Sequence, residues 1–436
     1  MAAPAHPMIS SEAVQAANSS TKDRYMASSG QNRRRHTRRR HSRVDSLRAP
    51  RSPTACSFSN SMPLKSLTAG FEAWKSVTGA MAECGNFQPE LDQDFRKKQP
   101  DAFAAKPALY QIGGVANSTM VPLLDAGTIR PLDSLVNKYG KHLKTNQLIK
   151  IEGKTMAVAM MVNAQHLMYR EDILNNLGIP VPTTYGELLS AAEKIKQAGS
   201  VDYPLGGTYK AGWNLGEEFI NMYLGYGGEF FGSGNYPAIN NIEGIATLET
   251  MKELTSYMDP EYLVSDSTYV QKQFQQGKIA IANLWASRAG AMDDAKESQV
   301  VGKVQFASAP APTAGNRPAS TLWWDGVVIA KNITDAQAEA AFRVAMEGLD
   351  REMVQAHNPD AIWLIDGYVP GKAAKGASET AANGAVPYPA SKKMGLMHTA
   401  LGNGIADFLK GAKDARTALA DIEVAYTTAA KEAGLL

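Results

Sequence analysis

Short β-prone runs alternate with helix-type segments from about residue 107 onward, and no other feature constrains the fold as strongly. Residues 108–112 form a β-prone run closed by two glycines, and residues 118–125 follow as a helical segment. Residues 155–162 are mostly apolar, which indicates a strand buried on both faces. This order of elements predicts an α/β protein with parallel strands.

Helix signals are equally clear in the same region. Thr184 is followed three residues later by Glu187, which is the spacing of a capping box, and apolar residues recur at helical spacing after it. The stretches 232–236 and 371–384 are rich in glycine or small residues and indicate a loop and a surface segment. The expected helices include residues 171–177, 184–198, 243–257, 268–276, 335–349 and 414–433.

Charge is divided unevenly along the chain. The 436 residues carry 45 Lys and Arg against 43 Asp and Glu, a net charge of +2, but the first 60 hold 11 of the basic residues and only 3 of the acids. Residues 31–51 contain nine arginines and one acid. The rest of the chain is therefore mildly acidic, and the overall net charge says nothing about its partners.

The basic head, residues 1–61, allows three interpretations. Clustered guanidinium groups suit a nucleic-acid-binding arm, because they neutralise phosphates and release counterions. A twin-arginine export signal requires an apolar stretch after the arginines, and residues 52–61 are polar. The head has no hydrophobic periodicity and joins a chain of different character, which favours a disordered or non-native segment over both.

Neither a membrane span nor a metal site is predicted. The sequence contains no run of eighteen or more apolar residues, so it does not predict an integral membrane protein. Cys56 and Cys84 are too few for a disulfide framework or a zinc site, and the seven histidines show no metal-ligand spacing. We therefore expect no metal and no cofactor.

Several motifs occur in a fixed order along the body of the chain. The longest, residues 153–189, has a Gly-Lys turn, a strand, a tyrosine, a helix ending in glycine, a proline-rich link and a helix start of the form Thr-Tyr-x-Glu-Leu. This order resembles the family of extracellular solute-binding proteins of carbohydrate ABC importers, with Tyr185 where that family usually has tryptophan. The further matching segments are residues 219–231, 274–280, 309–312, 323–330, 336–349 and 367–370.

The resemblance implies a two-lobed periplasmic-binding-protein fold of type II, in which each lobe is a mixed sheet flanked by helices. It implies a monomer that captures a sugar or sugar derivative in the periplasm by hinge closure, delivers it to ABC transporter permease subunits and catalyses no reaction. On this expectation, crossover segments lie near residues 159–163, 282–284 and 329. The first lobe takes residues 62–160 and 283–329, and the second takes 161–282 and 330–436.

One stretch departs from the family pattern. Chains of the family open with a buried strand, a helix and a second strand. Here residues 71–103 supply one amphipathic helix, and no good strand precedes it. We therefore expect the first lobe to lack an edge or central strand.

Sugar recognition needs flat apolar groups for the C–H face of the ring and planar polar groups for its hydroxyls. Trp323, Trp324 and Asp325 offer indoles beside a carboxylate. Because neighbouring strand residues point to opposite faces, we expect one of the two tryptophans to line the site and Asp325 to share the face of Trp323. The further candidates for ligand binding are Trp285, Arg288, Trp213, Tyr209, Asn163, Gln111 and Tyr368.

Two other classes of function stay open from the sequence alone. A glycosidase needs two carboxylates flanking the scissile bond, and no spacing singles out such a pair. Nucleophile-elbow and phosphate-loop patterns are absent. An intracellular nucleic-acid-binding protein would depend on the basic head alone. For a binding protein, the ligand is open among acidic sugars, disaccharides and polyols.

Overall fold

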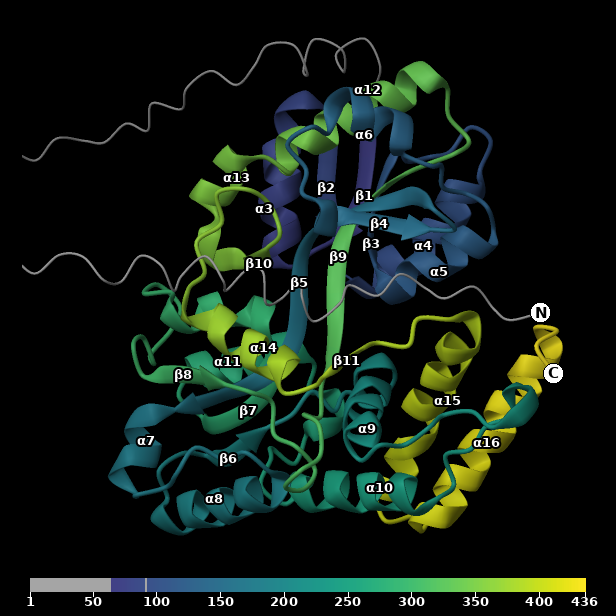
Figure 1. Cartoon of the computed structure of the whole chain (residues 1–436). Helices are drawn as coiled ribbons and strands as arrows, with labels where there is room; N and C mark the ends of the chain where they lie inside the picture. The colour runs from purple at the N-terminus through teal and green to yellow at the C-terminus, as the bar shows by residue number, and fades with distance from the viewer. Residues whose placement is uncertain (1–63, 91) are drawn as a thin grey trace, which may run out of the picture.

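The computed structural model describes residues 64–90 and 92–436 (Figure 1). The basic head lies outside this part of the chain, so its interpretations stay predictions. Two α/β lobes lie one above the other in Figure 1, and the strands β5 (Lys154–Arg170) and β9 (Thr321–Ile329) run from one lobe into the other. Within the described ranges, every helix is too short or too polar to cross a membrane.

One continuous mixed sheet passes through both lobes in the order β2-β1-β3-β9-β5-β7-β6. β1 pairs in parallel with β2 and β3, whereas β9 is antiparallel to both β3 and β5. β5 changes partners near its middle: residues 158–164 pair with β9, and residues 165–169 pair with β7. The two-lobed α/β architecture expected from the sequence is therefore confirmed.

The first lobe, the upper one in Figure 1, contains the amino-terminal strands and the helices that cover them. Its core includes the fully buried side chains of Trp74, Phe342 and Trp363. Its remaining elements are β1 (Lys65–Ala69), α3 (Glu72–Met81), β2 (Asn86–Glu90), α4 (Asp92–Ala104), β3 (Ile112–Ala116), α5 (Asn117–Asp125), α6 (Asp133–Tyr139), β4 (Leu148–Ile151), α12 (Asp335–Gly348), α13 (Arg351–Ala356) and β10 (Ile362–Trp363).

The second lobe, the lower one in Figure 1, packs its helices around the strands that continue from β5. Its core includes the fully buried Phe219, Tyr223 and Tyr426. Its elements are α7 (Glu171–Asn176), α8 (Tyr185–Ala198), β6 (Tyr203–Gly206), α9 (Trp213–Gly225), α10 (Ile242–Thr255), α11 (Ser267–Gln275), β7 (Ile279–Trp285), β8 (Val304–Ala307), α14 (Lys372–Ala382), β11 (Val386–Pro387), α15 (Lys392–Leu409) and α16 (Ala415–Glu432).

The expectation of a missing first strand is wrong. β1 lies between β2 and β3, and its Leu67 is fully buried. The segment 71–103 forms α3, β2 and α4 rather than one helix. β1 escapes prediction because the polar Ser66 and Thr68, which are also buried, alternate with its apolar residues. An interior strand is usually continuously apolar, and this one is not.

The strand expected at residues 108–112 is displaced along the chain. β3 begins at Ile112 and runs through Gly113 and Gly114. A Cβ on Gly113 would lie 2.6 Å from the Phe103 ring, and one on Gly114 would lie 2.9 Å from the Trp74 ring. The two glycines therefore do not end the strand. They permit close helix packing on both of its faces.

The segment 371–384, expected as a small-residue surface segment, forms the helix α14. Its Ala374, Ala377 and Ala381 are buried. Small side chains here allow a helix to pack closely onto β8 and β5. Sequence composition alone does not separate that role from a loop.

The lobes also divide the chain differently from the expected boundaries. β8, expected in the first lobe, pairs with the carboxyl-terminal half of β5 in the second. α12, expected in the second lobe, packs against α3 and α6 in the first. β7 lies wholly in the second lobe, so the expected crossover at 282–284 is wrong. β9 enters the first lobe near its start, not at Ile329, because Thr321 and Trp323 contact α9 of the second lobe.

Candidate functional site

Three tryptophans from three segments meet where the lobes adjoin. Trp285 ends β7, Trp213 begins α9 and Trp323 lies near the start of β9. The ring centroids of Trp213 and Trp323 are 5.7 Å apart, and those of Trp285 and Trp323 are 5.8 Å apart. Trp213 and Trp285 are nearly parallel, at 28° with centroids 6.5 Å apart. Both are only half-buried, so part of each remains accessible.

Strand direction explains why these residues meet. β6 and β7 are parallel, and their carboxyl ends lead to the segment before Trp213 and to Trp285. Gly212, with φ of 99°, makes the turn from which α9 starts, a conformation that favours glycine. In the first lobe, Ala116 at the carboxyl end of β3 packs with the second-lobe core. The carboxyl ends of strands from both lobes therefore lie near the three tryptophans. Ligands of open α/β sheets bind at the carboxyl ends of the strands.

His398 and Tyr388 fix the position of Trp213. The His398 ring stacks on the Trp213 ring at 4.9 Å, and its Nε2–H donates to the Trp213 carbonyl oxygen at 2.8 Å. Because Nε2 carries the hydrogen, Nδ1 accepts from the Tyr388 hydroxyl, also at 2.8 Å. Burial lowers the pKa of His398 to about 4, so its ring is neutral at pH 7. We call Trp213, Trp285, Trp323, Tyr388 and His398 the aromatic cluster.

Arg96 reaches the aromatic cluster from the first lobe. It lies on α4, and its Cζ is 4.7 Å from the centroid of the Trp213 ring. This is the distance of a cation–π contact, worth about 0.5–2 kcal/mol. The charge of Arg96 also contributes to the low pKa of His398, after the larger effect of burial. The site therefore combines a cation from one lobe with aromatic rings from the other.

Two adjacent acids, Glu217 and Glu218, are buried next to the aromatic cluster on α9. Glu217 Oε1 lies 2.8 Å from the Thr321 hydroxyl oxygen and accepts from Trp323 Nε1–H at 3.2 Å. Glu218 Oε1 accepts from Gln165 Nε2–H at 2.8 Å. Burial raises the pKa of Glu217 to about 8 and that of Glu218 to about 7, in opposition to these hydrogen bonds.

Of the predicted site residues, the structure gathers Trp213, Trp285 and Trp323 and places Asn163 beside them. Asn163 is opposite Trp323 in the β5–β9 register, and it both donates to Ser287 Oγ and accepts from the Ser287 amide. Asp325 is half-buried two residues further along β9. A ligand-binding role for each of these residues stays a prediction.

Four other predicted residues lie outside the aromatic cluster. Trp324 points to the opposite face of β9 and is buried among residues of β3, β5 and α14, as strand alternation requires. Tyr209 is buried in the second-lobe core. Gln111 lies at the start of β3, away from its carboxyl edge, where its Oε1 accepts from the Lys65 amide at 2.8 Å. Tyr368 packs against first-lobe core residues.

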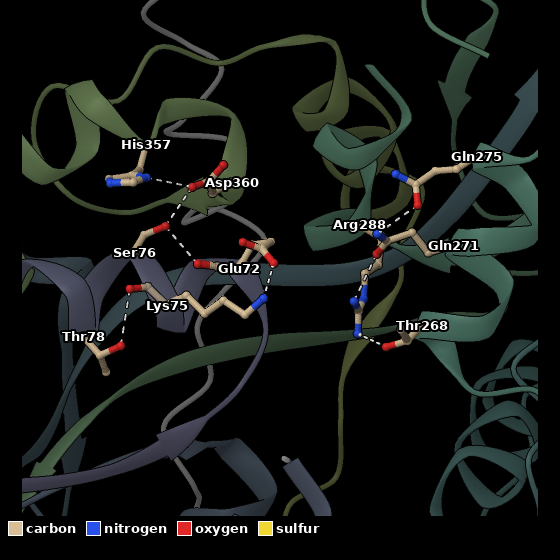
Figure 2. A network of polar contacts seen from close by, with 10 residues as sticks. All are labelled: Glu72, Lys75, Ser76, Thr78, Thr268, Gln271, Gln275, Arg288, His357 and Asp360. Carbon is tan, nitrogen blue, oxygen red and sulfur yellow. Dashed lines mark hydrogen bonds and ion pairs between the residues drawn. The ribbon is translucent and has the colours of Figure 1, made fainter. Parts of the chain in front are cut away.

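Arg288, also predicted to bind ligand, bonds to α11 instead (Figure 2). Its guanidinium donates to Gln271 Oε1 and Ser267 Oγ, both at 3.0 Å, and to Thr268 Oγ1 at 3.3 Å. These bonds tie the 3-10 segment after β7, Ala286–Asp293, to α11. They give Arg288 a structural role within the second lobe.

A serine, a histidine and an aspartate lie together in a first-lobe pocket (Figure 2). Ser76 Oγ donates to Asp360 Oδ2 at 2.7 Å, and His357 Nδ1 lies 3.0 Å from the same oxygen. In a hydrolytic triad the histidine bonds the serine, and the acid orients the histidine. Here both bond the aspartate, so His357 is not placed to activate Ser76. Among the described residues, no group of three or more His, Cys, Asp or Glu could hold a metal ion.

The sequence analysis did not identify four residues at or beside the aromatic cluster: Arg96, Glu217, Tyr388 and His398. Only Glu217 left a signal. It forms an acidic pair with Glu218 inside a helix whose other residues are mostly apolar, so burial of at least one acid could have been expected. The other three reach the site through long-range packing of segments that the sequence pattern did not relate.

Comparison with known proteins agrees with this architecture. The sequence pattern of bacterial extracellular solute-binding proteins matches residues 85–346. A ribitol complex of an ABC transporter solute-binding protein from Agrobacterium radiobacter K84 has a TM-score of 0.74 at 21% identity, covering 83% of this chain and 97% of that one.

Two further solved structures are similar to the chain. Maltose-bound MalE3 of T. maritima has a TM-score of 0.73 at 18% identity, covering 84% of this chain and 99% of that one. A D-mannitol complex of an ABC transporter solute-binding protein from Agrobacterium vitis S4 has a TM-score of 0.73 at 19% identity, with 85% and 99% covered. These similarities establish a shared two-lobed fold.

Proposed function

The chain belongs to the family of bacterial extracellular solute-binding proteins, and from this premise we propose that it captures a sugar or polyol at the aromatic cluster. The observation that carries the proposal is the meeting of Trp213, Trp285 and Trp323 where the two lobes adjoin. Accessible indole faces cover the C–H face of a sugar ring, and the amide of nearby Asn163 can bond its hydroxyls.

The ligands of similar structures support this ligand class. The proteins of similar fold were solved with ribitol, maltose and D-mannitol. All three ligands are polyhydroxylated and uncharged, and they differ in size and in being cyclic or open. We infer a ligand of the same chemistry for this chain, between an open-chain polyol and a short oligosaccharide.

Capture proceeds by closure of the lobes around the ligand. β5 and β9 are the strands that connect the lobes, so rotation about them changes the distance between α4 and α9. The closed, loaded protein then docks on the permease of an ABC importer in the periplasm, and it acts as a monomer. The protein performs no chemistry on its ligand, a reading supported by the unproductive arrangement of Ser76, His357 and Asp360.

Calorimetry of the full chain against a ligand panel tests this function. The panel consists of ribitol, D-mannitol, maltose, maltotriose and laminaribiose, with glutamate as an unrelated solute. We expect saturable one-site binding of at least one polyol or sugar and no heat with glutamate. A chain that is folded by circular dichroism but binds no member of the panel contradicts the proposal. Turnover of a chromogenic glycoside would contradict the absence of chemistry.

A further inference from the structure

A continuous chain of buried hydrogen bonds joins Glu217 to Glu218. It passes from Glu217 Oε1 through the Thr321 hydroxyl and the side-chain amides of Asn221 and Gln165 to Glu218 Oε1, with links of 2.7–3.3 Å. Each of the five residues is at most 7% exposed. Gln165 and Thr321 belong to the connecting strands β5 and β9, and the other three belong to α9. The chain of bonds therefore links both connecting strands to the helix that begins with Trp213.

A backbone carbonyl fixes the direction of these bonds. Asn283 Nδ2 donates to the carbonyl oxygen of Ala319 and to Gln165 Oε1, both at 3.2 Å. A backbone carbonyl can only accept, so the Asn283 amide cannot be turned round. Gln165 must then present its oxygen to Asn283 and its Nε2–H to Glu218.

The orientation of Gln165 in turn fixes the hydrogen-bond directions up to Glu217. Gln165 Oε1 also accepts from Asn221 Nδ2, which turns Asn221 Oδ1 toward Thr321. The Thr321 hydroxyl has one hydrogen, and its oxygen lies 2.7 Å from Asn221 Oδ1 and 2.8 Å from Glu217 Oε1. When that hydrogen bonds Asn221, the contact with Glu217 is a hydrogen bond only if the carboxyl carries its own proton.

The second oxygen of Glu217 agrees with this proton count. Glu217 Oε2 is buried and has no hydrogen-bond partner among the described residues. Burying an unpartnered charged oxygen costs far more than burying the carbonyl oxygen of a neutral acid. The pKa of Glu217 is raised to about 8, mainly by burial and also by the facing Glu218, against the opposing effects of its hydrogen bonds to Thr321 and Trp323 and of the facing Arg96. The buried Tyr388 also faces Glu217, and burial raises the pKa of Tyr388 well above 10.

We propose that Glu217 is a positioning residue for ligand binding, which as a neutral acid donates to Thr321 and so holds the indole of Trp323 in place. The Trp323 Nε1–H is shared between Thr321 Oγ1 at 2.8 Å and Glu217 Oε1 at 3.2 Å. When Glu217 ionises, its carboxylate and Asn221 Oδ1 compete for the single Thr321 hydrogen. The hydrogen bonds that hold the Trp323 indole then no longer have one fixed geometry. Affinity for sugar therefore falls as pH rises through the pKa of Glu217. This inference deepens the proposed function and rests on it.

The proton on Glu217 is tested without any sugar. Glu217→Gln keeps a donor toward Thr321 but cannot ionise, and Glu229→Gln is the same change at an exposed acid just after α9. Tryptophan emission of the full chain is followed between about pH 6 and about pH 9.5. We expect a transition centred near pH 8 in the wild type and in Glu229→Gln. Glu217→Gln should lack the transition near pH 8, although Glu218 still titrates near pH 7 in this variant.

A transition near pH 8 that persists in Glu217→Gln, or a wild type without one, overturns the proton assignment. Side-chain carboxyl ¹³C NMR of the wild-type chain gives an independent reading should the variant fail to fold. One glutamate carboxyl should titrate near pH 8, besides that of Glu218 near pH 7. If no observed glutamate carboxyl titrates near pH 8, the assignment is wrong.

The positioning role is tested with the panel member that binds most tightly, using calorimetry at the two ends of the same pH range. The wild type should lose about tenfold or more in affinity at high pH, whereas Glu217→Gln should bind equally well at both ends. Glu217→Ala should bind weakly throughout. Wild-type affinity that is independent of pH overturns the positioning role. A chain that binds no panel member refutes the proposed function, while the emission titration still decides where the proton lies.

Discussion

Arg96 of the first lobe and Trp213 of the second are in cation–π contact, with the guanidinium Cζ 4.7 Å from the ring centroid. α4 belongs to the first lobe and α9 to the second, so this contact crosses the boundary between the lobes. In the closure that we propose, this contact is expected to form when the lobes approach and to break when they separate. It links lobe geometry directly to the aromatic surface that we propose for the ligand.

Removing this contact should weaken closure. A cation–π contact at a partly exposed site contributes about 0.5–1 kcal/mol, so Arg96→Ala should raise the Kd for a bound sugar about two- to fivefold. Small-angle scattering should also show a larger radius of gyration for the unliganded variant. Lys97→Ala, at the exposed neighbouring residue, is the control and should change neither quantity. An Arg96→Ala chain with unaltered Kd and radius would refute the role of this contact.

A tryptophan of the aromatic cluster and one on the far face of β9 should respond differently to the same substitution. Trp213→Phe reduces an accessible indole face of the aromatic cluster and should raise the sugar Kd about tenfold. Trp324→Phe is the same chemical change at a buried residue on the far face of β9, and it should leave the Kd within about twofold. Calorimetry of both variants makes the comparison. Equal effects of the two substitutions would locate the ligand elsewhere.

The folded chain should lose stability in acid because of two buried histidines. Burial lowers the pKa of His166 to about 3 and that of His398 to about 4, against about 6.5 in an unfolded chain. Below about pH 6.5 the unfolded chain binds more protons, so stability is full above that pH and falls as pH drops toward 4. Urea unfolding at pH 5 and at pH 7 should show this loss in the wild type.

His166→Leu should flatten that dependence. Both ring nitrogens of His166 are buried without hydrogen-bond partners among the described residues, so its removal should also raise the free energy of unfolding at pH 7 by about 1–3 kcal/mol. The same urea experiment gives both numbers. An acid loss as large in His166→Leu as in the wild type would count against this explanation.

Two helical glycines give a matched test of how α14 packs. A Cβ on Gly376 would lie 2.4 Å from His166 Nδ1 and 2.9 Å from the Ala307 carbonyl oxygen, so Gly376→Ala should destabilise the chain by about 1–3 kcal/mol. A Cβ on Gly395 of α15 meets nothing within 4 Å, and Gly395→Ala should stabilise by about 0.5–1 kcal/mol. Thermal unfolding of both variants decides the matter. A neutral Gly376→Ala would mean that α14 does not pack against the β5–β8 region in this way.

Local patterns explain what could be predicted from the sequence. The Thr184–Glu187 capping box starts α8 as expected, and the helices expected at 243–257 and 335–349 agree with α10 and α12 to within two residues. The matched motifs likewise led to Trp285 and Trp323, because each lies on a strand whose burial is visible in its own residues. Periodicity and caps are local, so one sequence suffices to find them.

Contacts between distant segments could not be predicted in the same way. Arg96 meets Trp213 because α4 of one lobe faces α9 of the other, and His398 meets Trp213 through α15, a helix that the pattern did not reveal. The sequence pattern places this strand at residues 108–112, four residues before β3, so Gln111 lies at the amino end of β3 and not at the carboxyl end where the site is expected. Three-dimensional neighbours that share no sequence pattern need the structure.

The central claim is that a sugar or polyol binds against Trp213 and Trp285 between the lobes. The most direct test is a crystal structure of the full chain with the panel member that calorimetry shows to bind most tightly. We expect ligand carbons within about 4 Å of at least one of the two indole rings, with Arg96 on the first-lobe side of the ligand and the aromatic cluster on its second-lobe side. A ligand bound at any other place, with both indoles out of contact, would contradict it.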